Sequence, residues 1–167
     1  MGLLDILLGR KPFVSGPTPR LKQASAVKPT SPRTDTCWWA EEGTVALAAG
    51  RGFTFNIVGE SRYQKQLDRL CGGRCEEGHK KEVGARLTFE NNPHDRNAIA
   101  VSIQGKQVGW VPSELAAEMR AQISEVSPKG VVTCKAKIVG GWDKDDYQGS
   151  YGVKLSIPKP IKTYQPS

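Results

Sequence analysis

The chain has 167 residues, of which 38% are hydrophobic and 25% are charged, and its formal net charge is +7 at pH 7. This length suits one ordinary domain with a tail and leaves too little chain for two full cores. The positive charge favours polyanionic partners such as nucleic acid or an anionic membrane surface. Residues 51–167 hold 18 of the 24 Lys and Arg but 13 of the 17 Asp and Glu, so most of the excess charge lies there.

The first 36 residues predict no folded core. Residues 1–10 form a short apolar peptide, interrupted by Asp5, that is far shorter than the roughly 20 residues needed to span a bilayer. This peptide either packs on the domain or frays, or it serves as a membrane foot or docking peptide. Residues 11–36 hold five prolines among Ser, Thr, Lys and Arg, which predicts a disordered linker. Without a secretory signal, the four cysteines are expected to be reduced in a cytoplasmic protein that has no integral membrane association.

Residues 37–51 are expected to form a strap. Trp38 and Trp39 are costly to leave in solvent, so they either pack across the domain or bind a base or a protein partner. From residue 53 the alternation of apolar and polar residues predicts a strand at 53–58. A short helix follows at 61–70, with Ser61 as its N-cap and Gly72-Gly73 as its stop.

Further strands are predicted at 81–90, 132–138 and 151–157 from their period of two, with Thr133 facing outward from its strand. The central stretch 91–120 reads as a turn, a hairpin with strands 99–103 and 107–111, and a helix that begins near Ser113. A loop at 140–149 and a tail at 158–167 complete the chain. Six short strands with two helices predict a mainly β fold, a small OB-like or SH3-like barrel.

Two segments resemble the signature of the HIRAN domain family. Residues 92–101 fit the pattern N-P-x-D-x-N-A-I-x-V, and residues 107–116 fit Q-V-G-x-V-x-x-E-L-A. Residues 55–63 are similar to the family's first strand and its G-x-x-x-Y turn. The resemblance covers residues 52–157 and looks like the small stand-alone bacterial form of the family. It implies an OB-like barrel that binds single-stranded DNA, in one branch at a 3′-hydroxyl end, in DNA repair or replication-fork processing.

The resemblance also implies a binding site for nucleic acid. By this resemblance, Arg62 meets phosphate, the rings of the site stack on bases, and Asn92 and Asp95 bond a sugar hydroxyl. The alternative interpretation is that Asn92 and Asp95 only cap their turn and that Trp110 is a core residue. The chain has His94 where the end-binding branch has Tyr, and Trp110 where that branch has His. The expected site residues are Arg62, Tyr63, Asn92, His94, Asp95, Trp110 and Ser113.

Other chemistry has weaker sequence support. Cys71, Cys75 and His79 have a C-x3-C-x3-H spacing that lacks the paired knuckles of common zinc sites. The run Asp143, Asp145 and Asp146 fits a solvated hairpin loop better than a cation site. We therefore expect a non-catalytic, monomeric protein without metal or cofactor that binds single-stranded DNA or DNA ends. The alternatives are a protein-interaction module that uses the N-terminal peptide with Trp38-Trp39, and a zinc-binding or hydrolase-associated accessory domain.

Overall fold

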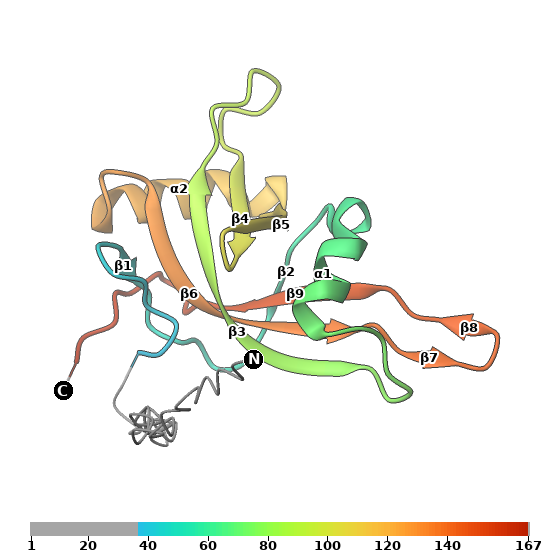
Figure 1. Ribbon diagram of the computed structural model, residues 1–167. Coiled ribbons are helices and arrows are strands. Elements are labelled where there is room, and N and C mark those ends of the chain that lie inside the picture. The colour runs from blue at the N-terminus through green and yellow to red at the C-terminus, as the bar shows by residue number, and fades with distance from the viewer. Residues whose placement is uncertain (1–36, 167) are drawn as a thin grey trace, which may run out of the picture. The chain divides into compact units, whose positions relative to one another are not determined.

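The computed structural model describes residues 37–166 and shows a mainly β protein with one curled, half-barrel sheet and two short helices (Figure 1). The predicted fold class is confirmed by this architecture. The apolar peptide predicted at residues 1–10 and the linker predicted at residues 11–36 lie outside the described residues.

All six predicted strands are present, and three two-residue strands accompany them. The first predicted helix divides into a 3-10 turn, η1, and an α-helix, α1. The bounds in chain order are β1 (Val45–Ala46), β2 (Phe55–Asn56), η1 (Glu60–Tyr63), α1 (Gln64–Cys71), β3 (His79–Phe89), β4 (Ile99–Ile103), β5 (Lys106–Trp110), α2 (Ser113–Val126), β6 (Val131–Gly140), β7 (Asp143–Lys144), β8 (Tyr147–Gln148) and β9 (Tyr151–Ser156).

The main sheet has the order β2-β9-β6-β3-β4-β5, and β1 adds to β6 in parallel. The sheet curls until its two edges meet. Just after β2, Val58 forms an antiparallel bridge with Trp110 at the end of β5. The two backbone hydrogen bonds of this bridge have N···O distances of 2.8 and 2.9 Å. We call this junction the seam, because it joins the first and last strands of the sheet.

The core follows the predicted alternation, since neighbouring residues of a strand face opposite sides of the sheet. Ile99, Val101 and Ile103 of β4 are fully buried. The central strands β3, β6 and β9 contribute the other inward residues. These are Val83, Ala85, Leu87, Val132, Cys134, Ala136, Ile138, Tyr151, Val153 and Leu155.

Thr133 is an exception to this alternation, as is Ser156 at the end of β9. Thr133 was predicted to face outward, and that prediction is wrong, because β1 pairs with β6 and covers it. The backbone N–H of Leu47 donates to the Thr133 carbonyl at 2.8 Å, and the hydroxyls of Thr44 and Thr133 lie 3.5 Å apart. The sequence did not predict β1, because a strand of only two residues shows no alternation.

Residues 37–51, which we call the strap, contact the sheet through the pairing of β1 with β6 and through Trp39. The indole N–H of Trp39 donates to the carbonyl of Leu47 at 3.0 Å. The backbone of Trp39 passes so close to Gly84 of β3 that a Cβ there would lie 3.1 Å from the Trp39 carbonyl oxygen. Trp38 remains 43% exposed. One tryptophan of the pair is thus committed to packing and the other faces solvent.

The helical segment after the seam begins differently from the prediction. Ser61 lies inside η1 and makes no capping hydrogen bond, so its predicted role as N-cap is wrong. Gly59, with φ of 85°, precedes η1 instead. The predicted stop is confirmed: Gly72 adopts a left-handed conformation, and the N–H groups of Gly72 and Gly73 donate to carbonyls of the last turn of α1.

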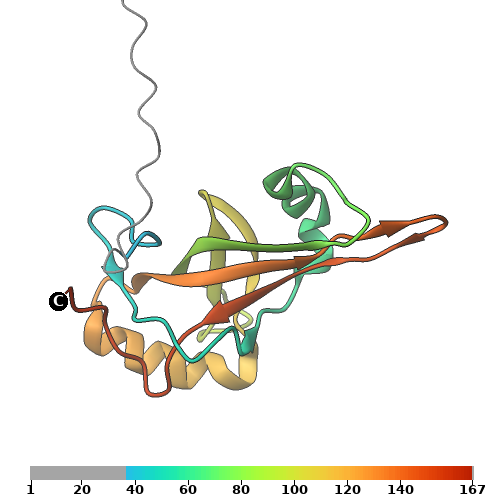
Figure 2. The ribbon, with the colours of Figure 1, turned by 90° about the horizontal axis from the view of Figure 1, so that it is seen from below.

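The segment 140–149, predicted as a loop, carries the short hairpin β7–β8, which extends beyond the ends of β6 and β9 (Figure 2). Asp145 occupies the tight turn with φ of 48°, and Asp146 beside it is exposed. The carboxylate of Asp143 accepts a hydrogen bond from the Gln148 amide at 3.2 Å. These contacts agree with a solvated hairpin.

Tyr151 ties β9 to α1. Its ring is buried, and its hydroxyl donates to the Asp68 carboxylate at 2.8 Å. Its backbone N–H and carbonyl both bond the side-chain amide of Gln64, at 2.8 and 2.9 Å. Burial first, and then the bond to Asp68, raises the pKa of the Tyr151 hydroxyl above its ordinary value.

We expect Tyr151 to make the protein less stable in alkaline solution. In the unfolded chain the tyrosine hydroxyl loses its proton near pH 10, which is a lower pH than in the folded protein. The contribution of Tyr151 is therefore complete below about pH 10 and is lost as the pH rises toward the raised folded pKa. Thermal unfolding at about pH 8 and about pH 11 should show a larger drop in Tm for the parent than for Tyr151→Phe. Tyr147→Phe, at an exposed position, should behave as the parent, and equal drops in all three proteins would contradict the prediction.

Between residues 37 and 166, no helix is both long enough and apolar enough to cross a membrane.

Candidate functional site

A pocket of about 490 Å³ opens at the seam, and we call it the seam pocket. It is formed by the chain just after β2, the turn between β3 and β4, and the junction of β5 with α2. Its lining residues are Val58, Gly59, Ser61, Arg62, Asn92, Asp95, Ala98, Trp110, Val111 and Ser113.

Glycine at position 59 is what lets the chain turn beside the pocket. Its φ of 85° is left-handed, which other residues rarely adopt. A Cβ at Gly59 would also lie 2.7 Å from the Trp110 ring. The G-x-x-x-Y pattern that ends at Tyr63 therefore reflects close packing of the backbone against the indole.

Five of the seven expected site residues line the seam pocket, and two do not. Tyr63 lies beside Trp110, with ring centroids 5.6 Å apart, and supports the indole. His94 is exposed on the turn outside the pocket lining. The residues that the structure brings together are Arg62, Asn92, Asp95, Trp110 and Ser113.

Trp110 is half-buried and forms a fixed wall of the seam pocket. Its indole N–H donates to the Glu90 carboxylate at 2.6 Å. The guanidinium carbon of Arg62 lies 6.0 Å from the centre of its ring. Trp110 thus combines the two expected alternatives, since it packs against Tyr63 and Gly59 while it also lines the cavity.

Asn92 and Asp95 each have one side-chain atom engaged in their turn. Asn92 Oδ1 accepts from the N–H of His94, and Asp95 Oδ1 accepts from the N–H of Asn97, both at 2.9 Å. The capping role is therefore real. Asn92 Nδ2 and Asp95 Oδ2 form no hydrogen bond with any residue in the described part of the chain. These two atoms are available to a ligand.

Ser113 places the start of α2 at the edge of the pocket. No side chain caps this helix end. The first N–H groups that bond inside the helix are those of Leu115 and Ala116, which share the Pro112 carbonyl. The N–H groups of the first helical residues are therefore unused within the helix and add donors at the pocket edge.

The cysteine and histidine constellation does not assemble into a metal site. His79 Nε2 lies 2.7 Å from the Gly73 carbonyl oxygen, and its ring stacks on Tyr151. Burial raises the pKa of the Cys71 thiol, which opposes the thiolate that zinc binding needs. Over residues 37–166, no three His, Cys, Asp or Glu side chains are grouped closely enough to hold a metal ion. Cys134 is a core residue, and burial raises the pKa of its thiol to about 12.

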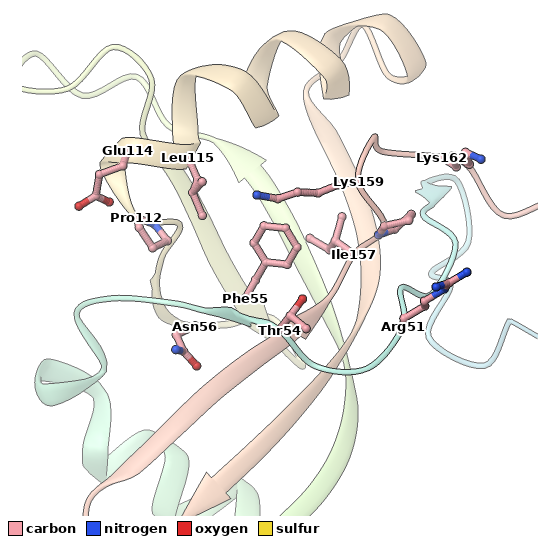
Figure 3. Close-up of a pocket in the computed structure, with 11 residues that line it drawn as sticks. Arg51, Thr54, Phe55, Asn56, Pro112, Glu114, Leu115, Ile157, Lys159 and Lys162 are labelled. Atoms are coloured by element: carbon pink, nitrogen blue, oxygen red, sulfur yellow. The ribbon is translucent and has the colours of Figure 1, made fainter.

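Two features of the site were not predicted from the sequence. One is Glu90, whose pairing with Trp110 depends on a contact across 20 residues. The other is a larger pocket of about 960 Å³ beneath the start of α2, which we call the tail pocket (Figure 3). Its lining residues are Arg51, Thr54, Phe55, Asn56, Pro112, Glu114, Leu115, Ile157, Pro158, Lys159 and Lys162. No signal pointed to it, because its cations come from segments without a periodic pattern.

The fold and the site together define a small curled β domain with an aromatic and polar pocket at its seam. Comparison of the chain with protein-family models, curated proteins and solved structures found no match.

Proposed function

We propose that this protein is a HIRAN-like module that binds single-stranded DNA, with a preference for 3′-hydroxyl ends, and that it does so without catalysing a reaction. The convergence of Arg62, Asn92, Asp95, Trp110 and Ser113 on one pocket carries the proposal. These residues come from three segments that are far apart in the chain, and each offers chemistry that suits a nucleotide.

Each part of a nucleotide has a partner in the seam pocket. The indole of Trp110 offers a stacking surface for a base, which is sequence-tolerant because every base has a π face. The guanidinium of Arg62 and the free donors at Ser113 suit phosphate oxygens. Asn92 Nδ2 and Asp95 Oδ2 suit the donor and acceptor atoms of a sugar hydroxyl.

Asp95 gives the proposal its sharpest test. A carboxylate accepts a hydrogen bond from a terminal 3′-hydroxyl, whereas it repels a 3′-phosphate. We expect short single-stranded DNA with a free 3′-hydroxyl to bind about tenfold more tightly than the same strand with a 3′-phosphate, measured by fluorescence anisotropy at low salt.

The matched variants separate this contact from general charge effects. Asp95→Asn keeps an oxygen for the turn bond to Asn97 and should reduce the discrimination between the two ends. Asp146→Asn removes the same charge from the exposed hairpin and should leave the discrimination unchanged. If the parent binds neither strand at low salt, the proposed function is wrong. If it binds both strands equally, the preference for hydroxyl ends is wrong.

The competing proposal is a protein-interaction module, and the exposure of Trp38 is the observation that favours it. Trp38 is 43% exposed, and the centre of its ring lies 5.8 Å from the Lys135 ammonium. The two proposals differ in their dependence on salt. Binding of DNA releases counterions and weakens steeply with salt, whereas an apolar contact through Trp38 does not.

A further inference from the structure

The tail pocket and the pocket lined by Arg86 and Lys129 each carry an excess of two positive charges, but Arg86 is paired with Glu41, so the unpaired excess is larger in the tail pocket. Three cations line it, from Arg51, Lys159 and Lys162, against one carboxylate, from Glu114. No ion pair joins these cations to another described residue. By contrast, the pocket beside α1 pairs two cations with two carboxylates. The charge of the tail pocket is therefore available to an anionic ligand.

Hydrogen bonds to neighbouring segments hold the backbone on either side of the three cationic residues. The N–H of Gly50 donates to the Ser156 hydroxyl at 3.1 Å, which sets Arg51 beside the end of β9. The N–H of Ala48 donates to the Lys162 carbonyl at 2.8 Å. The N–H of Ile161 donates to the side chain of Gln122 on α2, at 2.7 Å. The segment predicted as a tail is thus bound to both the strap and α2 over this length.

The floor of the tail pocket is apolar. Figure 3 shows Lys159 reaching over the ring of Phe55, beside Ile157 and Leu115, and the Lys159 ammonium lies 5.0 Å from the ring centre. Glu114 lies at the opposite end of the pocket from Arg51 and Lys162, and the Lys159 ammonium lies between the two ends (Figure 3). The pocket thus has an apolar floor and a rim of positive charge.

The tail pocket and the seam pocket are neighbours. Asn56 lines the tail pocket and Val58 lines the seam pocket, two residues further along the same segment. That spacing is about 7 Å in an extended chain. The two pockets also share the start of α2, where Pro112 lines one and Ser113 lines the other. The two pockets are therefore close enough for a ligand longer than one nucleotide to contact both.

We infer that the tail pocket is a phosphate-binding channel that receives the continuing backbone of the single strand whose end occupies the seam pocket. This inference rests on the proposed function and adds the path of the strand. Arg51, Lys159 and Lys162 contact successive phosphates, and the uncapped start of α2 lies between the two pockets. The bound strand is consequently several nucleotides long.

The inference predicts that affinity depends on strand length and on these three charges. Parent protein should bind a strand of about 12 nucleotides more tightly than one of about 4. Both lengths fall within the range of site sizes of OB folds, about 4–16 nucleotides. The triple variant Arg51→Gln, Lys159→Gln, Lys162→Gln should lose most of that gain. For three lost phosphate contacts, the slope of log K against log salt should become less steep by about 2. At about 0.1 M salt the loss in affinity for the longer strand should be about 10- to 100-fold.

A charge-matched control separates the channel from net charge. The variant Lys80→Gln, Lys106→Gln, Lys144→Gln removes three exposed cations that line neither pocket, and it should keep the parent slope within about 0.5. If the triple variant does not fold, the single variants Arg51→Gln and Lys162→Gln replace it. Each should make the slope of log K against log salt less steep by about 0.7.

The outcomes distinguish the two proposals. If the parent binds DNA but the channel variant keeps its slope, or if both triple variants lose the same amount, the channel is wrong and the seam pocket stands. If the parent binds neither strand at low salt, both proposals are wrong.

Discussion

Replacing Gly109 by alanine is expected to lower the free energy of unfolding by about 3 kcal/mol. Gly109 lies in β5 beside the seam, and a Cβ there would be 2.5 Å from the Val58 carbonyl oxygen. That oxygen accepts the seam hydrogen bond from the N–H of Trp110 at 2.9 Å. Because the obstructing atom belongs to the backbone, rotation of a side chain cannot relieve the clash, so the two edges of the sheet must separate.

Denaturant unfolding of Gly109→Ala measures this cost, and Gly105→Ala is its matched control. Gly105 occupies the turn of the same hairpin with φ of 74°, and nothing lies within 4 Å of a Cβ built there. Its substitution should cost only about 1 kcal/mol, through the left-handed backbone. If Gly109→Ala costs no more than Gly105→Ala, the seam opens easily and does not fix the pocket.

The sequence predicted the longer strands well because their alternation can be read locally, whereas the strand predicted at 53–58 forms only over Phe55–Asn56. In β4, for example, Ile99, Val101 and Ile103 alternate with small or polar residues, and all three are fully buried. The glycine stop of α1 was also readable, since Gly72 and Gly73 supply the left-handed conformation that ends a helix. Signals of this kind involve only neighbouring residues.

The features that could not be predicted depend on contacts between distant residues. Strand β1 spans two residues, too few to show a period, yet it buries Thr133 from across the chain. Ser61 had the chemistry of an N-cap, but the Gly59 turn beside Trp110 decides where η1 begins. Local propensity was outweighed at this point by closure of the sheet.

The residues of the two pockets also differ in whether the sequence could predict them. Arg62, Asn92, Asp95 and Trp110 were found because they lie in the segments that resemble a known family. The cations of the tail pocket lie in segments that show neither period nor motif, and only the folded chain brings them together. Sequence reasoning therefore located one pocket and missed its neighbour.

Replacing Trp110 by alanine should weaken binding of single-stranded DNA by about 5- to 150-fold, because base stacking on an aromatic ring contributes about 1–3 kcal/mol per base. Trp110→Phe should lose less, since it retains a ring in the wall of the seam pocket. It does remove the N–H that bonds the Glu90 carboxylate at 2.6 Å. Anisotropy titrations of the parent and both variants with one strand, at one salt concentration, measure the difference.

Trp38→Ala is the control for this experiment, because Trp38 is an exposed indole on the strap that does not line the seam pocket. It should leave the affinity for DNA unchanged. Circular dichroism of each variant at the assay temperature separates loss of the ring from loss of the fold, which matters because Trp110 also packs against Tyr63. If folded Trp110→Ala binds as the parent does, the indole is only a structural wall. If Trp38→Ala is the variant that weakens binding, the strand binds at the strap, and the seam pocket is not its site.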